Sequence, residues 1–141
     1  MAVLLGGRAA EDVVFGHTST GAADDLAKVT DIARSMAMRY AMVGALGHVS
    51  YEEDRPPFLG GPMPQGHREY SEATAREIDL SVREIVAASR GKALAVLRER
   101  KDALERGARL LLEKETLAEA DLAALKSRFD AAQDARQPVA V

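Results

Sequence analysis

The sequence predicts an all-α protein, a bundle of about five helices with one long irregular loop. Hydrophobic residues make up 47% of the chain but aromatic residues only 4%, so the core is aliphatic and rich in residues that favour helices. Apolar side chains recur at intervals of three and four over most of the sequence, which is the period of a helix. Helix-breaking Pro and Gly gather in residues 52–69, where we expect the loop. The alternation over residues 46–51 is also compatible with one short strand.

Two helices are expected before this loop, at residues 2–15 and 22–41. A glycine pair, Gly6 and Gly7, breaks or tightens the first helix, because glycine costs helix stability and lets another backbone approach closely. Gly16 then ends this helix.

Three further helices are expected after the loop, at residues 71–100, 101–113 and 116–129. Ser71 has the position of a cap for the first of them, and residues 116–119 have the pattern of a capping box for the last. Helical spacing predicts one inward stripe on the long helix, formed by Ala75, Ile78, Val82, Ile85, Ser89, Ala93, Val96 and Leu97. On the next helix it predicts an inward face of Leu104, Ala108, Leu111 and Leu112.

Composition limits what the chain can bind. The net charge of -3 and the pI near 5.6 argue against a nucleic-acid surface. The chain has no cysteine, and therefore no disulfide and no thiolate metal site. No apolar run approaches the roughly 18 residues of a membrane span, so the segment itself is expected to be soluble. We predict one domain over residues 1–130 and a flexible tail over the polar residues 131–141.

One carboxylate is predicted to lie on the apolar side of the second helix. Ser19 or Thr20 has the position of the cap of this helix, and Asp24 and Asp25 follow near its first turn. Helical spacing gives one polar row, Asp24, Lys28, Asp31 and Ser35, and one apolar row, Asp25, Val29, Ile32 and Met36. A charge on an inward face is costly unless it is paired or bound to a metal. On the residues alone, the favoured interpretation is that Asp25 caps its own helix or meets an arginine, and a metal is the alternative.

Short sequence blocks follow one another in a fixed order along the chain. The blocks are Leu4-Leu5-Gly6-Gly7-Arg8-Ala9-Ala10-Glu11, Ser19-Thr20-Gly21-Ala22-x-x-Asp25-Leu26, Ala33-Arg34-x-Met36, Leu46-Gly47, Phe58-Leu59-Gly60, Tyr70-Ser71-x-x-Thr74-Ala75, Ile78-Asp79-x-x-Val82-Arg83 and Leu111-Leu112-x-x-Glu115-Thr116-Leu117. Each block is weak on its own, but their order and spacing together are specific. They resemble the peptidase domain of the FtsH family, whose members are membrane-bound, ATP-dependent zinc metalloproteases, and the resemblance extends to Phe129.

The resemblance implies a metal site that this chain only partly contains. In the family, the aspartate that matches Asp25 is the third protein ligand of the catalytic zinc. The other two ligands are the histidines of an HExxH motif, which also carries the catalytic glutamate. This chain has no HExxH, and its histidines are His17, His48 and His67, none of them four residues from another. We therefore expect the C-terminal part of a protease domain, with Asp25 as its one metal ligand, no catalytic residue and no proteolysis alone.

The resemblance also implies the partners and the location of the whole enzyme. Zinc would bind at this domain, and ATP would bind in a domain that this chain does not contain. The enzyme would work as a hexameric ring that degrades membrane and cytosolic proteins. Membrane segments and the ATPase domain are expected to precede this domain, which would lie on the cytoplasmic side of the bacterial inner membrane.

Other interpretations remain open. Glu11 is a second candidate for the third ligand, because other HExxH enzymes use a glutamate there, although an ion pair with Arg8 or a role in orienting a ligand or the substrate also explains it. His17 lies near Asp25 in sequence, but a loop histidine beside a cap is usually solvated. A rival hypothesis makes the chain a complete, non-catalytic helical interaction or oligomerisation module derived from such proteases. An HExxH about 60 to 80 residues before Leu4 in the parent gene would exclude that module.

Overall fold

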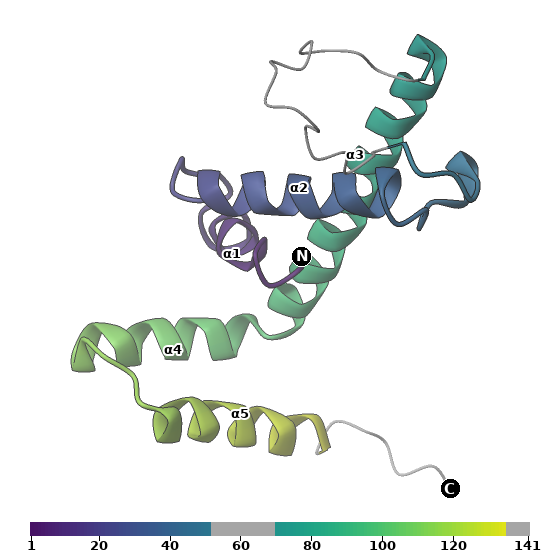
Figure 1. Cartoon of the computed structure of the whole chain (residues 1–141). Helices are drawn as coiled ribbons and strands as arrows, with labels where there is room; N and C mark the ends of the chain where they lie inside the picture. The colour runs from purple at the N-terminus through teal and green to yellow at the C-terminus, as the bar shows by residue number, and fades with distance from the viewer. Residues whose placement is uncertain (52–69, 135–141) are drawn as a thin grey trace, which may run out of the picture. The chain divides into compact units, whose positions relative to one another are not determined.

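The computed structural model describes residues 1–51 and 70–134, with side chains described as far as residue 126. No strand occurs among these residues, which confirms the all-α prediction. None of their helices combines the length and the apolar character that crossing a bilayer requires. The predicted loop, 52–69, and residues 135–141 of the predicted tail lie outside the described part. The elements are α1 (Gly6–Phe15), α2 (Ala23–Met38), the short 3-10 helix η1 (Gly44–Leu46), α3 (Glu72–Glu99), α4 (Lys101–Lys114) and α5 (Glu119–Asp134) (Figure 1).

The short strand considered for residues 46–51 does not form. Gly44–Leu46 makes η1, and Gly47 follows with a φ of 68°, which a strand does not adopt. The backbone N–H of Tyr51 donates to the carbonyl of Met38 at 2.7 Å rather than to a neighbouring strand. The alternation failed as a signal because a strand needs a partner strand, and the described part of the chain offers none.

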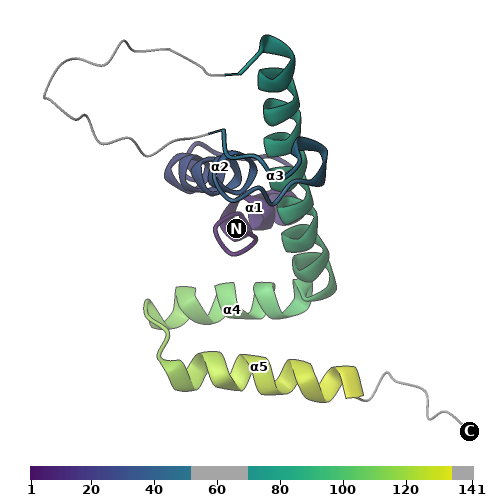
Figure 2. The ribbon, with the colours of Figure 1, turned by 45° about the vertical axis from the view of Figure 1, so that its right-hand side comes forward.

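The chain divides into two compact units, residues 1–93 and 94–141, and the division falls within α3. In the first unit, α1 and α2 lie beside α3 in both ribbon views (Figure 1, Figure 2). An ion pair joins Arg90 of α3 to Asp12 of α1 at 2.6 Å. A buried cluster joins α2 to α3 and comprises Ala37, Leu46 and Ile78, with Met38, Val43, Tyr51, Tyr70 and Val82 packed against it.

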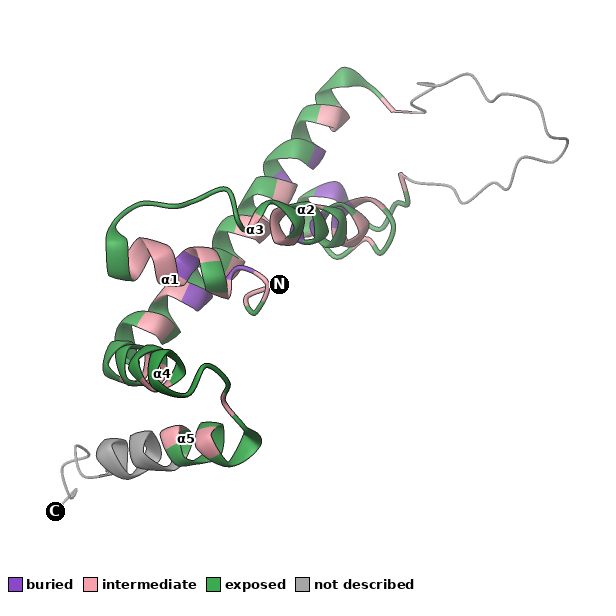
Figure 3. Ribbon diagram, turned by 90° about the vertical axis from the view of Figure 1, so that its left-hand side faces the viewer, coloured by how far each residue is buried: buried purple, intermediate pink, exposed green. Residues whose placement is uncertain are grey.

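Small side chains form much of this core. Ala9 of α1 and Ala33 and Ala37 of α2 are all buried, and Val29 of α2 is completely inaccessible. Figure 3 shows buried residues on each of α1, α2 and α3. A methyl side chain lets neighbouring helices come close. The buried hydrophobic residues in the described part of the chain are all aliphatic, as the composition predicted, and Tyr51 and Tyr70 pack against them while only partly buried.

The first two helices are shorter than the sequence predicted. Helix α1 begins at Gly6, because the preceding residues form turns in which the Leu5 N–H donates to the Met1 carbonyl at 3.1 Å. Gly16 ends α1 in the left-handed conformation, with a φ of 71°, as predicted. Helix α2 ends at Met38, three residues before the predicted limit.

The long helix α3 follows the prediction closely. The Ser71 hydroxyl accepts a hydrogen bond from the Thr74 N–H at 3.2 Å, so Ser71 is the predicted cap. The predicted stripe is buried or half-buried along most of its length, but Val96 is exposed. Ser81 is buried as well, which the stripe did not include.

In the second unit, α4 and α5 pack against each other as a helical hairpin (Figure 2). A Cβ added at Gly107 of α4 would lie 3.5 Å from the Leu125 Cδ1 of α5. The inward face predicted for α4 is right for Leu104 but wrong for Ala108, Leu111 and Leu112, which are exposed. The half-buried side is instead formed by Ala103, Leu104, Gly107 and Leu110. The prediction failed because glycine and alanine, which permit the close approach, add little to an apolar pattern.

The start of α5 also differs from the prediction. The helix begins at Glu119, and the Asp121 carboxylate accepts hydrogen bonds from the Ala118 N–H at 3.1 Å and from the Lys114 ammonium at 2.6 Å. The capping box predicted at residues 116–119 is therefore wrong. The Lys114 bond, followed by the Ala118 bond, lowers the pKa of Asp121.

Candidate functional site

Asp25 lies in the first turn of α2, on the edge of its buried side. Asp25 is half-buried, whereas its neighbour Asp24 is exposed. One turn later Val29 is fully buried, but Ile32, which the predicted apolar row included, is 42% exposed. The buried stripe of α2 continues instead through Val29, Ala33 and Ala37. Asp25 therefore stands at the N-terminal end of this stripe, one turn before Val29.

Within the described residues, no hydrogen bond or ion pair engages the Asp25 carboxylate. The N-cap of α2 is Ala22, whose side chain makes no capping bond. Both acidic residues of the first turn, Asp24 and Asp25, lie at the positive end of the helix dipole. In this part of the chain, neither an ion pair with an arginine nor a capping hydrogen bond therefore explains the half-buried position of Asp25.

Among the residues that the structure describes, the other two ligands of a zinc site are not found beside Asp25. No group of three His, Cys, Asp or Glu side chains in the described ranges could hold a metal ion. His17 is exposed and stacks on Phe15 with a centroid distance of 5.9 Å, and His48 is exposed as well. His67 lies outside the described residues. One half-buried carboxylate oxygen donor fits a zinc site, but a structural or catalytic zinc needs at least two more protein ligands.

Glu11 of α1 has both carboxylate oxygens engaged by one residue. Its Oε2 accepts the Ser19 backbone N–H at 2.8 Å, and its Oε1 accepts the Ser19 hydroxyl at 2.5 Å. The Arg8 guanidinium donates to the carbonyl of the same serine at 3.4 Å. The side-chain bond from Ser19, then the backbone bond, lowers the pKa of Glu11, and the charges of Arg8 and His17 add to this.

The role expected for Ser19 is therefore corrected. Its hydroxyl accepts the Gly21 N–H at 3.3 Å and donates to Glu11, and neither bond reaches a helical N–H of α2. Sequence reasoning missed this contact, because eight positions and a helix end separate Glu11 from Ser19. No periodic pattern connects two residues across such a loop.

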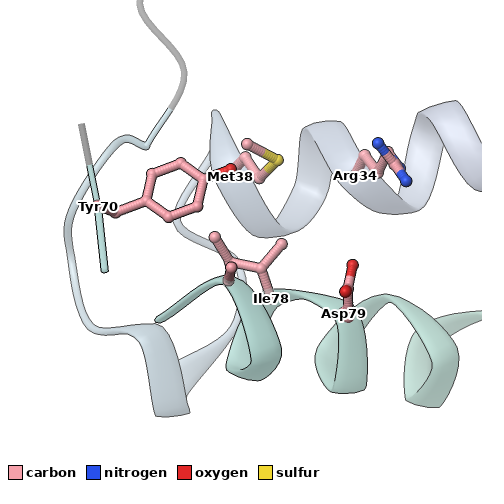
Figure 4. Close-up of a pocket in the computed structure, with 6 residues that line it drawn as sticks. Arg34, Met38, Tyr70, Ile78 and Asp79 are labelled. Carbon is pink, nitrogen blue, oxygen red and sulfur yellow. The ribbon is translucent and has the colours of Figure 1, made fainter. Parts of the chain in front are cut away.

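A hollow of about 160 Å³ lies elsewhere, between α2 and α3. It is lined by Arg34, Met38, Tyr70, Ala75, Ile78 and Asp79 (Figure 4). The charged Arg34 and Asp79 lie at one end, and Met38 and Tyr70 lie at the other (Figure 4). Arg34 follows Asp25 by nine positions, which at about 3.6 residues per turn puts it on the opposite side of α2. This hollow is therefore separate from the candidate metal ligand.

Comparison with known proteins places the chain in a family. The profile of Peptidase family M41 matches residues 1–125. An ATP-dependent zinc metalloprotease FtsH of Pseudomonas putida is 48% identical over 127 residues, which are 89% of this chain and 21% of that protein. An ATP-dependent zinc metalloprotease FtsH of Paraburkholderia phymatum is 48% identical over 133 residues, 92% of this chain and 20% of that protein. An ATP-dependent zinc metalloprotease FtsH 4 of Synechocystis is 46% identical over 118 residues, 83% of this chain and 19% of that protein.

The chain spans about a fifth of the length of these curated relatives. The match nevertheless covers most of the chain itself and includes all the elements of the first unit. The resemblance drawn from short sequence blocks is confirmed, and the chain belongs to Peptidase family M41.

Proposed function

We propose that this chain is the C-terminal part of the protease domain of a membrane-anchored, ATP-dependent zinc metalloendopeptidase, and that Asp25 is its ligand to the zinc. The observation that carries the proposal is the state of Asp25: a half-buried carboxylate at a helix start, without a partner among the described residues. Relatives named ATP-dependent zinc metalloproteases support the metal and the reaction class.

Asp25 would contribute a negatively charged oxygen to the metal from the first turn of α2. Two neutral histidines from an HExxH motif and this carboxylate leave one coordination position free for water or substrate. The zinc, when bound, lowers the pKa of a water molecule and polarises the scissile carbonyl. A general base is also needed to take a proton from that water, and this would be the glutamate of the HExxH motif. Because this chain has no HExxH, we propose that it supplies a ligand but neither the base nor a complete site.

The proposal extends to the rest of the enzyme. Its substrates would be membrane and cytosolic proteins, ATP would be hydrolysed in a separate domain, and the subunits would form a hexameric ring. The protease domain would lie on the cytoplasmic side of the bacterial inner membrane. The names of the relatives support the use of ATP and zinc, and the assembly and location rest on the family resemblance.

Zinc analysis of two purified proteins tests this proposal. The 141-residue chain should hold no stoichiometric zinc after dialysis against a mild chelator and should not cleave an unfolded protein such as casein. The same chain with the upstream sequence of its gene, including an HExxH, should hold about one zinc per chain, since that completes a three-ligand site.

Two outcomes would contradict the proposal. About one zinc on the 141-residue chain alone would show that its own side chains complete a site, and His17 with Asp24 or Asp25 would then be the first ligands to examine. A parent gene that begins at Met1, with no HExxH upstream, would favour the non-catalytic interaction module instead.

A further inference from the structure

The start of α2 has no side-chain cap of its own. The helix begins after Ala22, which has no hydroxyl or carboxylate to accept an exposed N–H. Ser, Thr, Asp and Asn are preferred at this position because they supply such an acceptor, and replacing them by Ala destabilises the helix end. The loop over residues 16–22 leads from the end of α1 to this uncapped start. Asp25 lies within the turn that follows, so its position depends on what holds this loop.

Glu11 binds Ser19, the middle residue of this loop. The two oxygens of its carboxylate accept the N–H and the hydroxyl of Ser19, at 2.8 and 2.5 Å. Hydrogen bonds to an ionised carboxylate are shorter and stronger than neutral ones, and two of them fix an orientation as well as a distance. Arg8, one turn earlier on α1, reaches the Ser19 carbonyl at 3.4 Å.

Hydrogen bonds then lead from Ser19 to the helix start. The Ser19 hydroxyl accepts the Gly21 N–H at 3.3 Å. The Ala23 N–H donates to the Thr20 carbonyl at 3.2 Å, and the Leu26 N–H donates to the Ala22 carbonyl at 3.0 Å. A continuous path of bonded backbone therefore joins the Glu11 carboxylate to the first turn of α2.

Helix α1 is itself anchored, so it can serve as the fixed side of this path. Asp12, the neighbour of Glu11, pairs with Arg90 of α3 at 2.6 Å. Ala9 lies one turn before Asp12 on the same face of α1 and is buried. Because α1 is held by both contacts, displacing the loop means breaking the Glu11 bonds rather than moving α1.

We infer that Glu11 is a positioning residue, whose carboxylate clamps Ser19 and thereby fixes the first turn of α2 that carries Asp25. The inference has a structural part, the fixed start of α2, and a consequence, tighter zinc binding by Asp25. Only the consequence rests on the proposed function. The structural part stands without any metal. The two parts can therefore be tested by different measurements.

Amide hydrogen exchange on the 141-residue chain tests the clamp. Glu11→Gln replaces one of the two accepting oxygens by an NH2 group, which cannot accept a hydrogen bond, and Ser19→Ala removes the hydroxyl. Both variants should accelerate exchange several-fold at the amides of residues 19–26, because each loses a bond to a charged group. Exchange at the buried Ala33 should stay unchanged. Ser19→Thr keeps the hydroxyl and should restore the wild-type rates.

Asp12→Asn is the matched control, since it alters the adjacent carboxylate, which pairs with α3 instead of the loop. It should accelerate amide exchange at residues 19–26 less than Glu11→Gln does. Unchanged exchange at these residues in both Glu11→Gln and Ser19→Ala would overturn the clamp. An equal acceleration at Ala33 would also overturn it, because Glu11 would then support the fold in general rather than the start of α2.

Zinc retention in the full-length protein tests the consequence. Glu11→Gln and Ser19→Ala should each weaken zinc binding several-fold but not abolish it, as expected of residues that orient a ligand. Ser19→Thr keeps the hydroxyl and should bind zinc as the wild type does. Complete zinc loss in Glu11→Gln, together with wild-type exchange at residues 19–26, would make Glu11 a ligand and overturn the inference. Full zinc retention in Asp25→Asn would contradict the proposed function. The amide exchange rates at residues 19–26 would still show whether Glu11 holds Ser19 and the start of α2.

Discussion

At the scale of single residues, the Glu11 carboxylate illustrates how a side chain on the surface can hold a fixed conformation. It accepts two hydrogen bonds from Ser19 and lies near the charges of Arg8 and His17. All of these contacts favour the ionised carboxylate, so they lower its pKa below the ordinary value of 4.5. The contact between Glu11 and Ser19 should therefore weaken as the pH falls.

Acidification should release the loop that Ser19 anchors. A group with a lowered pKa stabilises the folded state above its unfolded pKa, and this contribution is lost as the pH falls through its folded pKa. For Glu11 the loss should occur below 4.5. The carboxyl ¹³C shift of Glu11 and the amide shift of Ser19, followed by NMR, should change together in that window. A Glu11 midpoint at or above 4.5, or a Ser19 amide that does not respond, would contradict the contact.

At the scale of elements, periodicity and local capping signals were sufficient to predict the helices and some of their ends, but not all of them. The long stripe of α3 and its cap Ser71 were both predictable, because each depends on residues within one or two turns. The packed side of α4 and the start of α5 were not predictable, since Gly107 meets Leu125 of another helix and Asp121 bonds to Lys114. Contacts between elements decide such features, and a one-dimensional pattern does not contain them.

Two glycine substitutions test the account of the helices. Gly91 lies inside α3, and a Cβ there would meet nothing within 4 Å, so Gly91→Ala should stabilise the protein by about 0.5–1 kcal/mol. Gly16 ends α1 with a φ of 71°, so Gly16→Ala should destabilise it by about 1–2 kcal/mol. Urea unfolding of both variants measures the difference. Equal effects of the two substitutions would contradict the assigned backbone conformations.

At the scale of the whole molecule, the sequence predicted the fold class and the family, but it predicted only part of the candidate site. Helical spacing correctly distinguished half-buried Asp25 from exposed Asp24. It could not supply the other ligands, because this chain contains no HExxH motif. The sequence also predicted Ser19 or Thr20 as the cap of α2, whereas Ser19 bonds to Glu11 and the N-cap is Ala22. The assignment of Asp25 to zinc therefore remains a prediction of the family resemblance, supported by the unpartnered carboxylate.

The central claim is that Asp25 binds zinc, and one pair of variants tests it most directly. In the full-length enzyme, Asp25→Asn should keep the fold and the ATPase activity but lose zinc and proteolysis, because asparagine preserves the shape and removes the charge. Asp24→Asn is the matched control on the exposed side of the same turn. It should cost at most about 1 kcal/mol of helix-end stability and should leave zinc binding and proteolysis intact.

The decisive measurement is zinc per chain after dialysis, made on both variants beside an assay of protein degradation. We expect close to one zinc and full degradation for Asp24→Asn, and neither for Asp25→Asn. If Asp25→Asn retains its zinc and degrades substrate as Asp24→Asn does, then Asp25 is only a helix-start residue and the central claim is wrong.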